Sequence, residues 1–162
     1  DSEEALSNGS TQSNTEKFDL DDFSTLTLSK GFKVNLMKGD NYEMEVSSNR
    51  KFYTPDIRVS NNELNLSKLY FQLNEEETAN MEITITVPQL SQIRVSNKAD
   101  LNIEGFSTDH INIRVFDNES RVRINVNQEL NVTAAGFSSV SHKGKAQINI
   151  RNKGRSATVT KF

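Results

Sequence analysis

The residue types that most often carry catalysis or bind metals are few and scattered in this sequence. It has no cysteine, which excludes disulfides, thiol nucleophiles and cysteine-bound zinc. Its histidines, His110 and His142, stand far apart, without the His-x-x-x-His or His-x-Glu spacing of a metal site. The acidic segment at 19–22 lacks the glycine turn and the following glutamate of a calcium loop. We therefore predict neither a metal ion nor a cofactor.

Carboxylates are the other groups that this chain offers for catalysis. A glycosidase needs two of them on opposite sides of a bound sugar. The acidic residues near predicted strand corners are Asp100, Glu104, Asp109 and Asp117, and no spacing selects a pair among them. The sequence also lacks the nucleophile elbow, the phosphate-binding loop and the dinucleotide-binding fingerprint. These absences predict that the protein is not an enzyme.

Polar residues that recur in the second half of the chain are candidate binding residues. An apolar–Asn–apolar triplet repeats, and aligning the repeats places its asparagines in one outward column: Asn112, Asn131 and Asn149. The next outward position carries mostly arginine: Arg94, Arg114, Thr133 and Arg151. Stacked amides that hydrogen-bond along a column favour a structural ladder. Guanidinium groups repeated on one face favour an anionic ligand, or a solvated face that resists edge-to-edge aggregation.

These positions depend on strands that alternating apolar and polar residues predict. Segments 32–36, 42–46 and 81–87 alternate strictly, and Pro88 ends the last of them. From 93 onward two series of apolar residues interleave with a shared period of 18 to 21 residues. The first series is Ile93/Val95, Ile111/Ile113, Leu130/Val132 and Ile148/Ile150, and the second is Leu101, Val122, Val140 and Val159. Such a period is typical of a β-solenoid, whose turns stack strand on strand.

Length and charge limit the organisation of the chain. Its 162 residues correspond to about one domain. We expect a flexible polar linker at 1–17 and a single all-β domain at 18–162, with N-terminal capping strands at 18–88 and repeated turns at 89–162. The net charge of −3 argues against nucleic-acid binding. It conceals −10 over 1–120 and +7 over 121–162, where eight basic residues face one acid.

Several segments of the chain resemble a known family. They are 23–26 (FSTL), 32–40 (FKVNLMKGD), 63–66 (ELNL) and 83–90 (ITITVPQL), followed by the repeated turns. From about Phe18 to Phe162 the sequence resembles the putative auto-transporter adhesin head GIN domain family. The resemblance implies a right-handed parallel β-helix, a secreted or lipid-anchored place in the bacterial envelope, and adhesion. It supplies no catalytic residue, and the bulkier corners at 97–100 and 117–120 depart from the family's small turns.

Together these observations predict a non-enzymatic cell-envelope binding module, an adhesin that presents a repetitive polar face to a glycan or a surface protein. Contact with a membrane is expected only through an N-terminal lipoprotein anchor that has been removed together with its signal peptide. Two alternatives remain open. One is a polysaccharide-degrading, pectinase-like β-helix enzyme, and the other is a structural surface module that self-associates through an exposed solenoid end.

Overall fold

A computed structural model describes most of the chain beyond its first residues. The described residues are 14–29, 31–52, 56–69, 71, 74, 76–77, 80–96, 98–104, 110–115, 120–125, 129–134, 139–143, 147–153 and 158–161. The first strand begins at Asn14, inside the segment expected to be a linker. The remainder of that segment lies outside the described residues.

Strands make up nearly all the regular structure of the described residues. They are β1 (Asn14–Asp19), β2 (Thr25–Leu28), β3 (Lys33–Lys38), β4 (Glu43–Ser48), β5 (Val59–Ser60), β6 (Glu63–Asn65), β7 (Glu82–Val87), β8 (Gln92–Val95), β9 (Asp100–Glu104), β10 (His110–Val115), β11 (Arg121–Asn125), β12 (Glu129–Ala134), β13 (Ser139–Lys143), β14 (Gln147–Lys153) and β15 (Thr158–Lys161). A short 3-10 helix, η1 (Leu66–Lys68), follows β6. The prediction of an all-β domain is confirmed.

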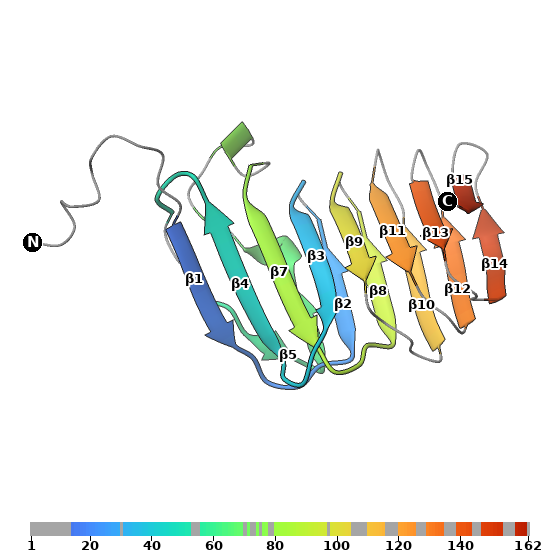
Figure 1. Cartoon of the computed structure of the whole chain (residues 1–162), viewed down its shortest axis with the longest axis horizontal. Coiled ribbons are helices and arrows are strands. Elements are labelled where there is room, and N and C mark those ends of the chain that lie inside the picture. The colour runs from blue at the N-terminus through green and yellow to red at the C-terminus, as the bar shows by residue number, and fades with distance from the viewer. Residues whose placement is uncertain are drawn as a thin grey trace, which may run out of the picture.

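The strands form two layers. An eight-stranded sheet, here sheet A, has the order β1-β4-β7-β3-β9-β11-β13-β15, and a seven-stranded sheet, sheet B, has the order β14-β12-β10-β8-β2-β6-β5. Figure 1 shows sheet A in front of sheet B, with β1 at one edge and β15 at the other. From β7 to β15 the chain alternates between the two sheets. Each strand from β8 to β13 pairs in parallel with the strand two places later.

The prediction of a right-handed parallel β-helix is wrong, because both sheets are mixed. The pairs β1–β4 and β4–β7 in sheet A are antiparallel, and so is β5–β6 in sheet B. After the turn at 39–42 the chain stays in sheet A, where β4 runs in the direction opposite to β7 and β3. Strand β7 then inserts between β3 and β4.

The predicted repeat is correct in one sheet and displaced in the other. In sheet A, Leu101, Val122, Val140 and Val159 are successive Cα partners, as expected. In sheet B, Ile93 pairs with Ile113 instead of Ile111. Strand β10 begins two residues before the register with β8 starts, so the first apolar residue of each strand is not the equivalent position.

The hydrophobic core lies between the two sheets. Alternation turns every second side chain inward, as the buried positions of β3, β4 and β7 show. One inward column of sheet A runs through residues that are all buried: Met44, Ile85, Leu36, Ile103 and Ile124. Aromatic rings close the core near β3, where Phe71 meets Phe32 and Phe52 edge-on at centroid distances of 6.0 and 5.6 Å.

Candidate functional site

The predicted asparagine column lies on the outward face of sheet B. Asn112 pairs with Asn131, and Asn131 pairs with Asn149, so the predicted alignment of their backbones is confirmed. Gln92 of β8 extends the column by one more amide. The side chain of Asn112 is exposed, whereas those of Asn131 and Asn149 lie outside the described part. Their role in binding stays a prediction.

The predicted arginine column is shorter than the sequence indicated. Arg94 pairs with Arg114, and Arg114 pairs with Thr133. The register between β12 and β14 then shifts after Val132, so that Thr133 pairs with Asn152. This bulge displaces Arg151 from the column. The side chain of Arg151 lies outside the described residues, and the arginines that the structure places side by side are Arg94 and Arg114.

Two further strands, which the predicted columns did not include, complete this face. Thr27 of β2 pairs with Arg94 on one side and with Asn65 of β6 on the other. Thr25 lies beside Gln92, and also beside Glu63, whose carboxylate accepts a hydrogen bond from the hydroxyl of Thr27. The alternation of threonine and leucine over 25–28 was the signal for these positions. The outward face of sheet B thus presents hydroxyl, amide and guanidinium groups.

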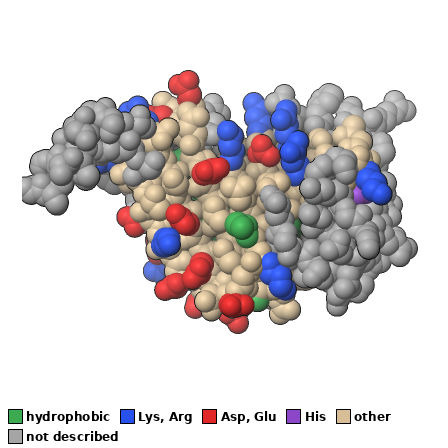
Figure 2. Space-filling model, in the orientation of Figure 1, with side chains coloured by type: hydrophobic (Ala, Val, Ile, Leu, Met, Phe, Trp, Pro, Cys, Tyr) green, Lys and Arg blue, Asp and Glu red, His purple; other side chains and the backbone are tan. Residues whose placement is uncertain are grey.

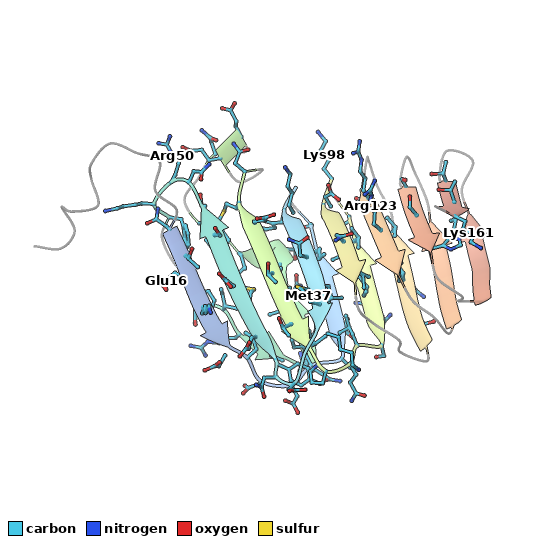
Figure 3. All side chains as sticks on the ribbon, in the orientation of Figure 1. Glu16, Met37, Arg50, Lys98, Arg123 and Lys161 are labelled. Carbon is cyan, nitrogen blue, oxygen red and sulfur yellow. The ribbon has the colours of Figure 1, made fainter. Side chains whose placement is uncertain are left out.

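The outward face of sheet A is broad and mostly uncharged in its middle. Figure 2 shows acidic side chains toward the N-terminal strands and basic ones along the upper rim above β3, β9 and β11. Across that rim the charges alternate in sign from strand to strand in the order Glu82, Lys33, Asp100 and Arg121. Met37 lies near the centre of the face and is 47% exposed, the largest apolar exposure among the described residues (Figure 3).

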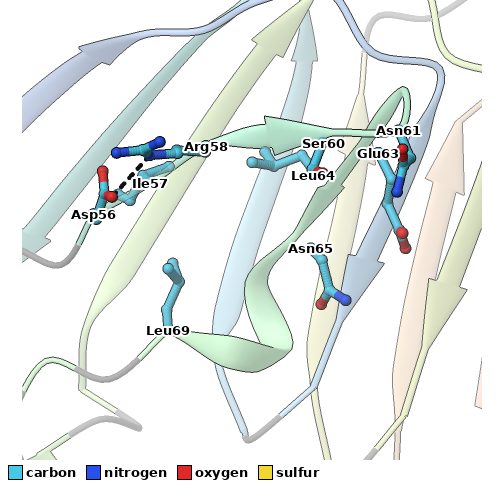
Figure 4. A pocket seen from close by; sticks show the side chains of 9 residues that line it. All are labelled: Asp56, Ile57, Arg58, Ser60, Asn61, Glu63, Leu64, Asn65 and Leu69. Atoms are coloured by element: carbon cyan, nitrogen blue, oxygen red, sulfur yellow. Dashed lines mark hydrogen bonds and ion pairs between the residues drawn. The ribbon is translucent and has the colours of Figure 1, made fainter.

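A hollow of about 260 Å³ lies beside the edge strand β5, and neither Arg94 nor Arg114 lines it. Its lining combines apolar groups such as Ile57, Leu64 and Leu69 with polar groups from β5 and β6 (Figure 4). The ion pair between Arg58 Nε and Asp56 Oδ2, at 2.8 Å, stands at this hollow with both side chains largely exposed. Because exposed ion pairs contribute little to stability, this pair does not mark a functional site.

His142 occupies an inward position of sheet A. It continues the column of Ile103 and Ile124, and Lys161 follows it on β15. Burial, and then the positive charge of Lys161, lower the pKa of His142 from its ordinary value of 6.5. At the other end of the sheet, burial and then Asp22 raise the pKa of Tyr42 from its ordinary value of 10.0.

Neither a metal site nor a membrane-spanning helix occurs in the part of the chain that the structure describes. No three histidine, aspartate or glutamate side chains there come together as metal ligands. None of the helical segments described is long and apolar enough to cross a bilayer. Of the carboxylates considered above, Asp109 and Asp117 lie outside the described residues.

The fold resembles solved bacterial structures. A putative adhesin from Bacteroides fragilis is 15% identical with a TM-score of 0.50, and the match covers 94% of this chain and 98% of that one. A putative lipid binding protein from Parabacteroides distasonis is 10% identical, with a TM-score of 0.47 and coverage of 96% and 98%. A putative cell adhesion protein from Clostridium sporogenes is 10% identical, with a TM-score of 0.47 and coverage of 93% and 99%.

At these identities the likeness to the Bacteroides protein concerns the fold alone. No curated protein matches the chain. The model of one protein family, however, matches residues 22–157, which include all the strands from β2 to β14. The chain therefore belongs to the family described as putative auto-transporter adhesin, head GIN domain.

Proposed function

We propose that this chain is a non-enzymatic binding module of the bacterial cell envelope, which holds a glycan or a surface protein on the outward face of sheet B. The observation that carries the proposal is the in-register polar face, where amides at Gln92 and Asn112 adjoin guanidiniums at Arg94 and Arg114. Membership of an adhesin family supports it. A lipoprotein anchor preceding this sequence would hold the module at the surface.

A flat face suits adhesion better than catalysis. Glycosidases place their carboxyl groups about 5 to 10 Å apart across a bound sugar. Asp100 and Glu104 stand at the two ends of β9, four residues apart, which separates their backbones by about 13 Å at 3.3 Å per residue. They also belong to sheet A, whereas the amide and arginine columns belong to sheet B. The pectinase-like alternative therefore has no support from these carboxylates.

The experiment measures binding of the whole chain to a glycan array and to proteins from bacterial surfaces. The test variant, Gln92→Ala/Asn112→Ala, removes two neighbouring amides from sheet B. Its matched control, Asn35→Ala/Thr84→Ala, removes two neighbouring polar side chains from the outward face of sheet A. We expect Kd to rise roughly tenfold in the test variant, since each lost hydrogen bond costs about 0.5–1.5 kcal/mol.

The control variant is expected to bind like the wild type. The reverse pattern, with binding lost in the control and kept in the test variant, would assign the function to sheet A. Light scattering on the same samples tests the remaining alternative, self-association. A molecular mass that rises with concentration, without any glycan or protein ligand, would favour a structural module over an adhesin.

A further inference from the structure

We propose that Arg94 and Arg114 form a site for the acidic groups of a polysaccharide, an inference that rests on the proposed function and names the class of its ligand. The two residues are Cα partners on the parallel strands β8 and β10. They alternate with buried neighbours such as Ile113, so both side chains leave the outward face of sheet B. Neighbouring strands lie about 4.8 Å apart, which places the guanidinium stems side by side.

Two like charges directly opposite each other on neighbouring strands destabilise a sheet unless an acid compensates them. Neither arginine makes an ion pair with any residue that the structure describes. Their other partners in register are Thr27 on β2 and Thr133 on β12, neither of which is charged. The sheet thus carries an electrostatic cost at this pair that the described residues do not offset.

The acidic residues described on sheet B form no ion pair with either arginine. Glu63 is on β6, and its carboxylate accepts a hydrogen bond from Thr27, the partner of Arg94 on β2. Glu129 pairs with His110 at the start of β10, four residues before Arg114. Four residues of strand correspond to about 13 Å. No acid that the structure describes neutralises the positive charge of the pair, which suits it to an anionic ligand.

The groups around the pair indicate which ligand fits. Guanidinium groups bind carboxylates and sulfates in bidentate geometry. Two residues before them, on the same face, Gln92 and Asn112 are partners whose amides donate hydrogen bonds to hydroxyl groups and accept them. Acidic groups set among hydroxyls are the chemistry of polysaccharides that carry uronic acids or sulfates.

Nucleic acid fits this face less well, although it is also a polyanion. Proteins that hold single strands stack the bases on aromatic side chains. The outward positions of β2, β6 and β8, together with Asn112 and Arg114 of β10, are threonine, glutamate, asparagine, glutamine and arginine, with no phenylalanine, tyrosine or tryptophan among them.

The test measures binding of the whole chain to heparin, polygalacturonate, dextran and a single-stranded oligonucleotide. We expect binding to one or both acidic polysaccharides, weakened by salt, and none to dextran or the oligonucleotide. Heparin binding alone identifies sulfate as the recognised group, and polygalacturonate binding alone identifies carboxylate. Equal binding of the oligonucleotide, or no binding of either acidic polysaccharide, would overturn the proposal.

The decisive variant is Arg94→Gln/Arg114→Gln, which keeps hydrogen-bonding side chains and removes both charges. Its matched control, Lys17→Gln/Lys33→Gln, removes the same charge from exposed outward positions of sheet A. Each arginine lost is expected to raise Kd roughly tenfold or more. The control should stay within about twofold of the wild type, because exposed charges beyond a Debye length are largely screened.

Equal losses in both variants, or an unchanged Kd in the arginine variant, contradict the arginine site. Binding of a neutral glycan or a protein that depends on Gln92 and Asn112 but survives the arginine variant would contradict it too, while leaving the adhesin role in place. Thermal unfolding without ligand gives an independent readout. Arg114→Gln should leave Tm unchanged or raise it slightly, because repulsion is relieved. A marked fall in Tm would make Arg114 a structural residue.

Discussion

The two ends of sheet A are built differently, although one column of inward side chains runs through both. Toward the N-terminal edge the column holds Met44 and Ile85, which are 1% and 0% exposed. Toward the other edge it passes from Ile124 to His142 and then to Lys161, an exposed residue. The column thus lies in an apolar core at one end of the sheet and in a partly polar interior at the other.

The difference follows from topology as well as from side-chain type. The antiparallel strands β1 and β4 extend sheet A beyond the first parallel pairs, and Phe23 and Tyr42 pack beside them with ring centroids 5.3 Å apart. The residues of β15 are partly buried at Val159 and exposed elsewhere. Among the described side chains of sheet A, the inward positions from β4 to β11 are thus buried, whereas those of His142 on β13 and Val159 on β15 are only partly buried.

The largest expected effect comes from comparing a fully buried inward position with a partly buried one. Ile85→Ala empties a fully buried position on β7 and should lower the free energy of unfolding by about 3–4 kcal/mol. Val159→Ala removes a partly buried side chain from β15 and should cost less than about 1 kcal/mol. Urea denaturation of the two variants measures both values. Equal costs would show that the core is uniform along the sheet.

A smaller effect is expected at the turn that reverses the chain in the antiparallel half. A β-carbon at Gly39 would collide with the γ-methyl of Thr86 on β7. Gly39→Ala should therefore destabilise the protein by about 1–3 kcal/mol, as overpacking does. Thr86→Ser removes that methyl, so the double variant should recover most of the loss in a double-mutant cycle. Additive effects of the two substitutions would mean that the turn tolerates the change in another way.

The smallest effect concerns the polar end of the column. Folding lowers the pKa of His142 below 6.5, so the unfolded chain binds more protons as pH falls below that value. This histidine should leave stability unchanged above its ordinary pKa and reduce it slightly on acidification, because the ring is only partly buried. His142→Leu should weaken this pH dependence.

Titration of the ring by NMR checks the same prediction without unfolding the protein. The pKa of His142 should lie below 6.5 and should rise in Lys161→Gln, since Lys161 is the second cause of the shift. A pKa at or above 6.5 would mean that the C-terminal end of the core is fully hydrated, and it would make the contrast between the two ends larger than inferred.

Local patterns in the sequence predict the strands and half of their register. The alternation over 81–87 corresponds closely to β7, and the spacing of Leu101 and Val122 is that of true partners. Pairings between distant segments leave no such pattern. Nothing in the sequence near the turn at 39–42 indicates that β7 will insert between β3 and β4, because that choice depends on contacts made far along the chain.

The alternation of the sequence also predicted part of the candidate site, namely the pair of arginines but not the bulge that ends their column. Arg94 and Arg114 share an outward position because each precedes an inward valine near the end of its strand. Arg151 occupies the same position in the sequence pattern, yet the bulge after Val132 removes it from the column. A one-residue irregularity leaves the hydrophobic spacing almost unchanged, so only the structure locates it.

The alternation of the chain between the two sheets from β7 onward also bears on how such a protein can change in evolution. Because each strand from β10 to β13 pairs with the strands two places before and after it, a unit of two strands can be duplicated or deleted there without breaking pairings elsewhere. A duplication would add one strand to each sheet and one residue to each outward column. Length, and with it the number of contacts to a repetitive ligand, can therefore vary independently of the N-terminal half.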